Sequence, residues 1–361
     1  MTSTIENSDK AGKRFVISID AMGGDRGPAA VVAGVSHSAK KNPDIAFILH
    51  GPEEKLRRLV KKKRVLRDRV EFRDAKEVVS MDDKPSQTLR RGDATSMWSA
   101  IESVKNGEAS VCVSCGNTGA LMLLSVVRLR KLPGVNRPAI AVLWPSNNPS
   151  GSSVMLDVGA DIRADENDLL QYALMGTSYA RNGFDIQQPR IGLLNVGTEE
   201  FKGRPELKLA SELISENSER GNYQYAGFVE GNDIPSDKVD VIVTDGFTGN
   251  IALKSAEGTA RLIRGFLKEA FAYSILSRLA TLLAYPSLRR LSKRIDPRRV
   301  NGGVFLGLNG TVVKSHGAAD ATSVSAAVKL AYQLAQSGFN QKLAARVASA
   351  STLDQNNEKE N

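Results

Sequence analysis

The stretch "VDVIVTDGFTGNIALKSAEG", residues 239–258, passes from an apolar, β-rich run through a polar turn with two glycines into a helical pattern. The same succession recurs along the chain. Short buried strands that alternate with longer helices are typical of α/β proteins, so the sequence predicts a largely parallel sheet covered by helices on both faces. The predicted strands are residues 14–20, 46–51, 109–115, 139–145, 153–159, 190–197, 239–245 and 310–317. The predicted helices are residues 28–41, 94–107, 165–183, 205–221 and 250–275.

Length and composition predict one large folded unit. The chain has 361 residues, 41% of them hydrophobic, and no repeat or flexible linker divides it. We expect one α/β domain, single or bilobed, over residues 14–345, between polar tails at 1–13 and 346–361. The apolar runs are shorter than a membrane-spanning helix needs, and the start lacks a signal-peptide pattern, so we expect a cytoplasmic protein.

The positive charge is unevenly placed. The formal net charge is +9, and basic residues cluster at 55–69 and 274–299, which favours an anionic partner. In the second cluster an apolar stripe lies on one helical face. We predict a basic amphipathic membrane-contact element over residues 271–299, since such an element can lie on an anionic membrane surface; a dimer interface or a packed helical hairpin is the alternative. Few aromatic residues interleave with the charges, so we expect no nucleic-acid partner. The predicted membrane-contact residues are Ile275, Leu276, Leu279, Leu282 and Leu283.

The two cysteines, Cys112 and Cys115, spell C-x-x-C inside an apolar run. A structural zinc would need two further ligands, and the chain has only three histidines, none of them at ligand spacing to another. We therefore predict that both cysteines are buried packing residues and that the protein holds no metal.

Four turns share one design, in which an apolar strand runs into a short glycine-bearing segment and then a helix. They are residues 20–28, 115–120, 195–205 and 244–250. In open α/β sheets ligands bind beyond the carboxyl ends of strands, where helix N-termini offer free N–H groups. The turns predict a shared phosphate or carboxylate pocket, while the nucleotide-binding fingerprints are missing. The candidate ligand-binding residues are Gly23, Gly24, Asp25, Gly116, Asn117, Thr118, Gly119, Gly197, Thr198, Asp245, Gly246, Thr248, Gly249 and His316.

Three side chains that follow predicted strands, Lys202 and Asn250 on these turns and His316 after another strand, are of types that can act in catalysis. Lys202 could neutralise an anion or be an ordinary surface lysine, and Asn250 could hydrogen-bond a reacting group or only cap a helix. His316 could act as an acid or base or cap a turn. The residues alone leave these alternatives open.

Several long motifs resemble the bacterial phosphate acyltransferase family of phospholipid synthesis, the PlsX family. They occur in the family's order and cover roughly residues 14–340. The resemblance implies a three-layer αβα fold similar to phosphotransacetylases and to isocitrate and isopropylmalate dehydrogenases. The motifs are "ISIDAMGGDRGP", "SCGNTGALM", "RPAIAVLWP", "MLDVGAD", "QYALMG", "IGLLNVGTEEFKG", "VIVTDGFTGNIALKSAEG" and "GGVFLGLNGTVVKSHG".

The resemblance also implies an activity. Such enzymes transfer a fatty acyl group from acyl-[acyl carrier protein] to inorganic phosphate, as homodimers without a cofactor. They work at the inner face of the cell membrane and supply a glycerol-3-phosphate acyltransferase. Carried over by motif, Lys202 and Asn250 match the family's active-site lysine and asparagine, and the stretch around Leu279 matches its membrane-contact tip. A phosphotransacetylase using short acyl-CoA and a catalytically weakened membrane scaffold remain the alternatives.

This chain departs from the family pattern at four positions, namely Gly92, Asp93, Asp161 and Asn232. Each change removes positive charge or adds negative charge near a motif. We expect any effect to fall on phosphate or carrier binding, with the fold unaffected.

Overall fold

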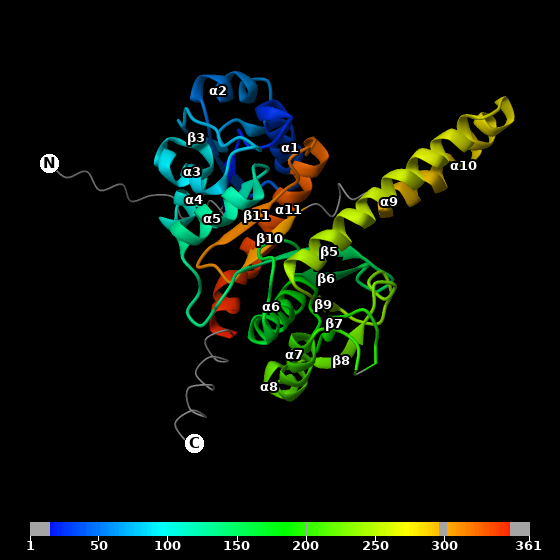
Figure 1. Cartoon of the computed structure of the whole chain (residues 1–361). Coiled ribbons are helices and arrows are strands. Elements are labelled where there is room, and N and C mark those ends of the chain that lie inside the picture. The colour runs from blue at the N-terminus through cyan, green and yellow to red at the C-terminus, as the bar shows by residue number, and fades with distance from the viewer. Residues whose placement is uncertain (1–14, 200, 296–301, 347–361) are drawn as a thin grey trace.

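An 11-stranded sheet organises the chain in the computed structural model, which describes residues 15–199, 201–295 and 302–346. Figure 1 shows the sheet running through the molecule with helices on both sides. The strands, in chain order, are β1 (Phe15–Asp20), β2 (Ile45–His50), β3 (Val70–Arg73), β4 (Val111–Ser114), β5 (Ala139–Pro145), β6 (Ser152–Leu156), β7 (Arg190–Leu194), β8 (Gln224–Val229), β9 (Val241–Val243), β10 (Gly303–Leu306) and β11 (Thr311–Lys314). The helices are α1 (Gly27–Lys41), α2 (Glu53–Lys61), α3 (Pro85–Arg91), α4 (Ser96–Lys105), α5 (Thr118–Leu129), α6 (Glu166–Phe184), α7 (Pro205–Glu216), α8 (Ser218–Gly221), α9 (Gly246–Ala272), α10 (Ile275–Ile295) and α11 (Ala321–Ser337).

The strand order is β3-β2-β1-β4-β11-β10-β5-β6-β9-β7-β8. Seven of the ten pairings among the described strands are parallel, which confirms the largely parallel sheet. The three antiparallel pairings join β11, β10, β5 and β6 in the middle. These three pairings divide the strands into two directions: β3, β2, β1, β4, β11 and β5 run one way, and β10, β6, β9, β7 and β8 run the other way. The carboxyl ends of β1, β4 and β11 therefore lie at one edge of the sheet, and those of β6, β9 and β7 lie at the opposite edge.

All eight predicted strands are present, and the structure adds β3, β8 and β10. All five predicted helices are present, one of them divided into α7 and α8, and the structure adds α2, α3, α5 and α11. Central strand residues such as Ile17, Val113 and Val313 are fully buried, because the sheet is covered on both faces. Helix starts follow ordinary capping chemistry. Asp165 and Asp168 form a capping box at α6, and Asp320 accepts backbone N–H groups at the start of α11.

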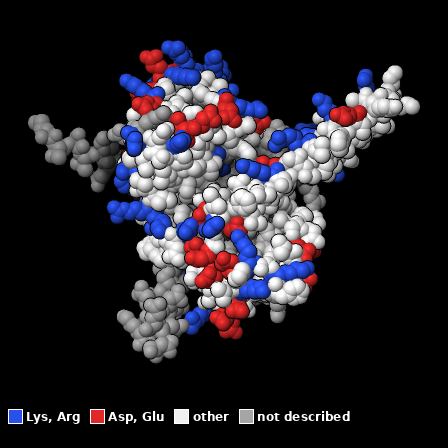
Figure 2. Space-filling model, viewed as in Figure 1, with Lys and Arg blue, Asp and Glu red and all other residues white. Residues whose placement is uncertain are grey.

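The helices α9 and α10 form a long hairpin that projects away from the sheet (Figure 1). The second basic cluster therefore forms part of a packed helical hairpin, one of the alternatives for this segment. No other described part of this chain covers the apolar stripe of the hairpin. The five predicted membrane-contact side chains are 54–87% exposed, and the far end of the hairpin is white in Figure 2. No helix in the described ranges is long and apolar enough to span a bilayer. The two predicted tails lie outside the described residues, apart from residue 346.

Candidate active site

An elongated cavity of about 430 Å³ runs along β5 beneath the first turns of α9. Its wall is mainly apolar, with polar groups at both ends. Asn250 lies at one end, near the start of β5, and His316 lies at the other, near the strand's carboxyl end. The apolar side chains that line it include Ile140, Val142, Leu143, Trp144, Val158, Leu253 and Ala256. The polar or charged side chains that line it are Thr118, Asn250, Lys254, Glu257, Lys314, Ser315 and His316.

The position of Asn250 is fixed by close packing of the first turn of α9. Asp245 caps this helix by accepting the backbone N–H of Thr248 at 2.8 Å. Gly249 lies so close to the carbonyl of Asp157 that a side chain there would collide with it. The Asn250 amide nitrogen then donates to the carbonyl oxygen of Val158 at 3.1 Å. Asn250 is therefore more than a helix cap, because its side chain bonds across to another loop and lines the cavity.

The loop that receives Asn250 is held by the Asp157 carboxylate. This fully buried group accepts backbone N–H bonds from Ile140 at 2.8 Å and from Asp161 at 2.9 Å, and from the two residues between Val158 and Asp161 as well. Burial raises the pKa of Asp157, and these backbone hydrogen bonds oppose that shift. The sequence indicated the loop by its motif but gave no sign that Asp157 organises it.

The opposite end of the cavity contains Lys314, Ser315 and His316, at the end of β11. Burial lowers the pKa of Lys314 to about 8, with Cys115, Asp20 and Asp25 acting in the opposite direction. The Ser315 hydroxyl is buried and has no nitrogen or oxygen partner among the described residues. The His316 Nε2 atom lies 2.9 Å from the Glu257 carboxylate of α9.

Sequence reasoning singled out His316 and missed Lys314. The available signal was a lysine that ends an otherwise apolar strand, "TVVK", and is followed directly by a serine and a histidine. A long cationic side chain in such a place needs an anionic or polar partner.

The turn at residues 20–28 is built by Asp20, whose buried carboxylate accepts the hydroxyl groups of Ser96 and Ser114, both at 2.7 Å. Gly24 has φ +91°, and a Cβ atom there would lie 2.8 Å from the carbonyl oxygen of Gly317. This turn therefore packs against the segment after β11, and Gly24 permits that close approach.

The turn at residues 115–120 contributes Thr118 to the cavity wall. Asn117 caps α5, because its side-chain oxygen accepts the N–H of Ala120 at 3.0 Å. Its amide nitrogen donates to the carbonyl of Met81 at 2.8 Å. Of the predicted binding residues in this turn, only Thr118 lines the cavity.

Lys202 lies on the connection between β7 and α7, at the same sheet edge as Asn250. Its Nζ atom pairs with Glu199 at 2.7 Å, and this hydrogen bond raises the pKa of Lys202. The turn is tied to the start of α9 by the ion pair between Arg204 and Asp245. Lys202 itself does not line the cavity that contains Asn250.

Within the described part of the chain the four turns do not form one pocket, which corrects the expectation of a shared pocket. The three antiparallel pairings put residues 20–28 and 115–120 at one edge of the sheet and residues 195–205 and 244–250 at the other. The cavity instead spans the sheet between the edges and collects one predicted residue from each of two turns, Thr118 and Asn250, together with His316.

Both cysteines are buried and free, which confirms their prediction as packing residues. Burial raises the pKa of Cys115 to about 11 and that of Cys112 further, so neither thiol is reactive near neutral pH. The described residues contain no cluster of side chains suited to a metal ion.

The structure shows the local surroundings of three of the four residues that depart from the family pattern. The added charge of Asp161 is paired with Arg137. Gly92 has φ +58° and ends α3. Asn232 is exposed in the loop after β8. The side chain of Asp93 lies outside the described part of the chain.

Comparison with known proteins gives the chain a family. A family model described as "Fatty acid synthesis protein" matches residues 15–342. The chain is 70% identical to the phosphate acyltransferase of Ruegeria sp. (strain TM1040) over 355 residues, which are 98% of this chain and 95% of that one. It is 68% identical to the phosphate acyltransferase of Paracoccus denitrificans (strain Pd 1222), with 96% of this chain and 94% of that one covered.

Among solved structures, a phosphotransacetylase from Streptococcus pyogenes has a TM-score of 0.59 at 18% identity, with 90% of this chain and 94% of that one covered. The EutD phosphotransacetylase from Staphylococcus aureus has a TM-score of 0.56 at 15% identity, with 91% of this chain and 95% of that one covered. These likenesses confirm the predicted fold. The near-complete match to curated relatives establishes that the chain belongs to the phosphate acyltransferase (PlsX) family.

Proposed function

We propose that the protein transfers a fatty acyl group from acyl-[acyl carrier protein] to inorganic phosphate, and that the acyl phosphate serves phospholipid synthesis. The observation that carries this proposal is the cavity along β5, which joins a long apolar wall to polar and cationic groups at its ends. The relatives named phosphate acyltransferase support the same reaction class.

The apolar wall fits an acyl chain better than a small acetyl group. Trp144, Val142 and Leu253 lie along the same cavity as Asn250. Removing apolar surface from water contributes roughly 25 cal/mol per Å², so a long chain would gain much of its binding energy from such a wall. A two-carbon acyl group would leave most of it unused.

The reaction needs positioning and charge neutralisation. A phosphate oxygen attacks the thioester carbonyl, the new C–O bond forms, and the C–S bond breaks. The phosphate's remaining proton ends on the departing thiolate, which gives acyl phosphate and the free carrier thiol. Asn250 hydrogen-bonds the reacting groups, and Lys314 supplies positive charge inside the cavity. Lys202, which lies outside the cavity at the same sheet edge as Asn250, holds phosphate or the developing oxyanion; this role is carried over from the motif. No cofactor takes part.

The partners follow from the substrates and the surface. Inorganic phosphate is the acceptor, and the acidic carrier protein docks on a basic surface. The exposed hairpin tip touches the inner face of the cell membrane, where the acyl phosphate passes to a glycerol-3-phosphate acyltransferase. The protein works there as a cytoplasmic, peripherally associated homodimer.

The test is direct. The purified protein is incubated with palmitoyl carrier protein and phosphate, and acyl phosphate is trapped with hydroxylamine. We expect product only when phosphate is present, and little turnover of acetyl-CoA. Folded protein that forms no product would overturn the proposal, and equal turnover of acetyl-CoA would point to a short-chain phosphotransacylase.

A further inference from the structure

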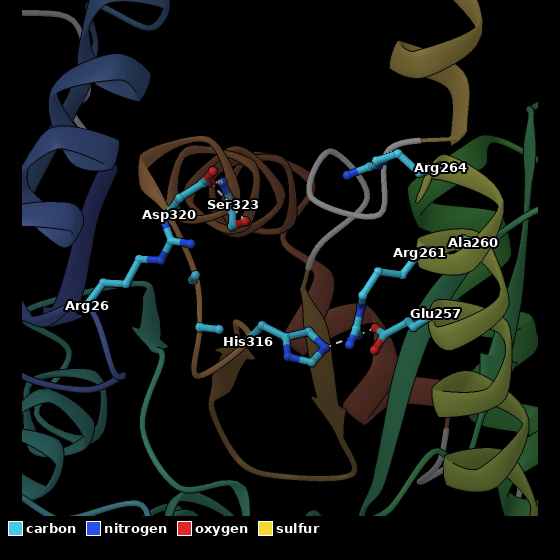
Figure 3. A pocket seen from close by; sticks show the side chains of 10 residues that line it. Arg26, Glu257, Ala260, Arg261, Arg264, His316, Asp320 and Ser323 are labelled. Carbon is cyan, nitrogen blue, oxygen red and sulfur yellow. Dashed lines mark hydrogen bonds and ion pairs between the residues drawn. The ribbon is translucent and has the colours of Figure 1, made fainter. Parts of the chain in front are cut away.

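A second cavity, of about 220 Å³, adjoins the first at His316 and Glu257. Three arginines approach it from two sides. Figure 3 shows Arg26 entering from the turn after β1, while Arg261 and Arg264 enter from α9. We call this cavity the arginine vestibule.

The acidic groups of the vestibule are already engaged. The Glu257 carboxylate bonds His316 at 2.9 Å. Asp320 caps α11 by accepting the N–H of Thr322 at 3.0 Å and that of Ser323 at 2.9 Å. Arg26 and Arg261, in contrast, form no ion pair with any described residue.

Two such guanidinium groups on opposite walls of a small cavity favour an anion. Arginine is the preferred partner of phosphate because its fork of N–H donors matches the phosphate oxygens. The vestibule is smaller than the roughly 300 Å³ lower end of ordinary small-molecule sites, so it suits one phosphate group or a short part of a longer ligand.

We propose that the arginine vestibule binds a phosphate group carried into the enzyme by one of its substrates. This inference rests on the proposed function, which supplies two sources of that chemistry. One is inorganic phosphate. The other is the phosphate at the root of the pantetheine arm that bears the acyl thioester, and the shared wall at His316 favours this source. An arm whose phosphate lies in the vestibule would reach past His316 and deliver its thioester into the cavity along β5.

The experiment measures binding, so that it does not depend on turnover. Isothermal titration calorimetry compares phosphopantetheine, pantetheine and inorganic phosphate against the wild-type chain and the variants Arg26→Gln and Arg261→Gln. Arg220→Gln is the control, since Arg220 is an exposed arginine on α8. We expect each vestibule variant to weaken phosphopantetheine binding about ten-fold and to leave pantetheine binding unchanged. We expect Arg220→Gln to bind all three probes like the wild type.

The outcomes separate the sources. If the variants weaken only the binding of inorganic phosphate, and phosphopantetheine binds no better than pantetheine, the vestibule is a site for free phosphate. If neither phosphate-bearing probe is affected, the inference is overturned. If the protein binds phosphopantetheine through these arginines but makes no acyl phosphate, the inference about the vestibule holds and the proposed reaction is refuted.

Discussion

The amide nitrogen of Asn250 donates a 3.1 Å hydrogen bond to the carbonyl oxygen of Val158, and so joins the first turn of α9 to the loop after β6. The bond holds the Asn250 side chain at the wall of the cavity along β5. A polar group held in place before the substrate arrives needs no reorganisation during the reaction.

Replacing Asn250 with Ala should therefore lower kcat for acyl phosphate formation about 100-fold, by analogy with the loss of one preorganised donor. The cost in stability should be only about 1 kcal/mol, because one hydrogen bond is lost. Stopped hydroxylamine assays and urea unfolding measure the two effects.

The matched control is Asn217→Ala, which removes an amide that donates to the Leu213 carbonyl at 2.9 Å at the end of α7. It should cost similar stability and leave kcat unchanged. Equal activity in Asn250→Ala and Asn217→Ala would remove Asn250 from the reaction.

Lys202 pairs with Glu199 at 2.7 Å on an exposed turn. Removing the Lys202 side chain therefore tests its part in the reaction with little effect on the stability of the fold. Exposed ion pairs contribute little to stability. Lys202→Ala should lower activity at least ten-fold at an unchanged melting temperature. Glu199→Gln should keep most of the activity, because it removes only the partner that raises the pKa of Lys202.

Lys238→Ala is the control for Lys202. Lys238 pairs with Asp233 at 3.0 Å, and the two lysines are almost equally exposed, 41% and 42%. Loss of activity in both variants would indicate a general effect of surface charge. Full activity in Lys202→Ala would exclude Lys202 from the reaction.

The alternation of strand and helix in the sequence was enough to predict the sheet, but some strands lacked a local signal. β3 and β8 are the two edge strands, and β3 carries charged residues at two of its four positions. β10 has four residues and gains its place only from pairing with β5 and β11. Long-range pairing of this kind leaves little trace in a short segment.

The reversal of strand direction did leave a trace. The connection between β5 and β6 comprises residues 146–151, and a parallel crossover needs a dozen residues or more. Those two strands therefore had to be antiparallel. Because helices join β4 to β5 and β6 to β7, as in parallel crossovers, the four glycine turns could not share one edge. The site was predicted in part, since Asn250, Thr118 and His316 meet in the cavity while Lys314 and Asp157 were missed. Their roles depend on what surrounds them, which a sequence motif does not show.

The pKa of Lys314 is lowered to about 8 by burial, which predicts a pH dependence of phosphate use. Lys314 is positively charged below this value and neutral above it, so the KM for phosphate should rise as the pH increases from about 7.5 to about 9.5. Steady-state kinetics at saturating acyl donor measure this change.

Lys314→Gln should have a high KM for phosphate at every pH in that range, and Lys314→Arg should keep a low KM to higher pH because arginine stays protonated. The same pH dependence in wild type and Lys314→Gln would show that another group is responsible.

Leu279 is 54% exposed near the end of the hairpin, on the uncovered apolar stripe. Burying a leucine in an apolar environment is worth about 1.5–3 kcal/mol, and a carboxylate would be repelled by anionic lipid. Leu279→Glu should lower partition onto anionic vesicles at least ten-fold in a sedimentation assay, with turnover of soluble substrate unchanged.

Leu209→Glu is the control, because Leu209 on α7 is similarly exposed at 48% and lies away from the hairpin. It should bind vesicles like the wild type. Unchanged vesicle binding by Leu279→Glu, or equal loss in both variants, would contradict membrane contact through the tip.

His50 is fully buried, and its ring nitrogens lie 2.9 Å from the Ser18 hydroxyl and 2.8 Å from the Ser99 hydroxyl. Burial, with a smaller effect of Arg73, lowers the pKa of His50 to about 3. In the unfolded chain it would be close to 6.5, so the unfolded state binds a proton first as the pH falls. The stability that neutral His50 contributes is thus complete above about pH 6.5 and is lost progressively as the pH falls toward 3. Linkage gives a loss of roughly 2 kcal/mol between about pH 6.5 and pH 5.

Urea unfolding across this range should show that loss in the wild type and in His37→Gln, since His37 is exposed on α1. His50→Gln should start less stable at pH 7, because its packing is altered, and then show a shallower pH dependence. Comparing the two slopes above pH 5 keeps most carboxylates ionised in both states, so the difference reports on the histidine. Parallel slopes for His50→Gln and wild type would mean that His50 binds its proton over the same pH range in the folded and unfolded chains, which would contradict the lowered pKa.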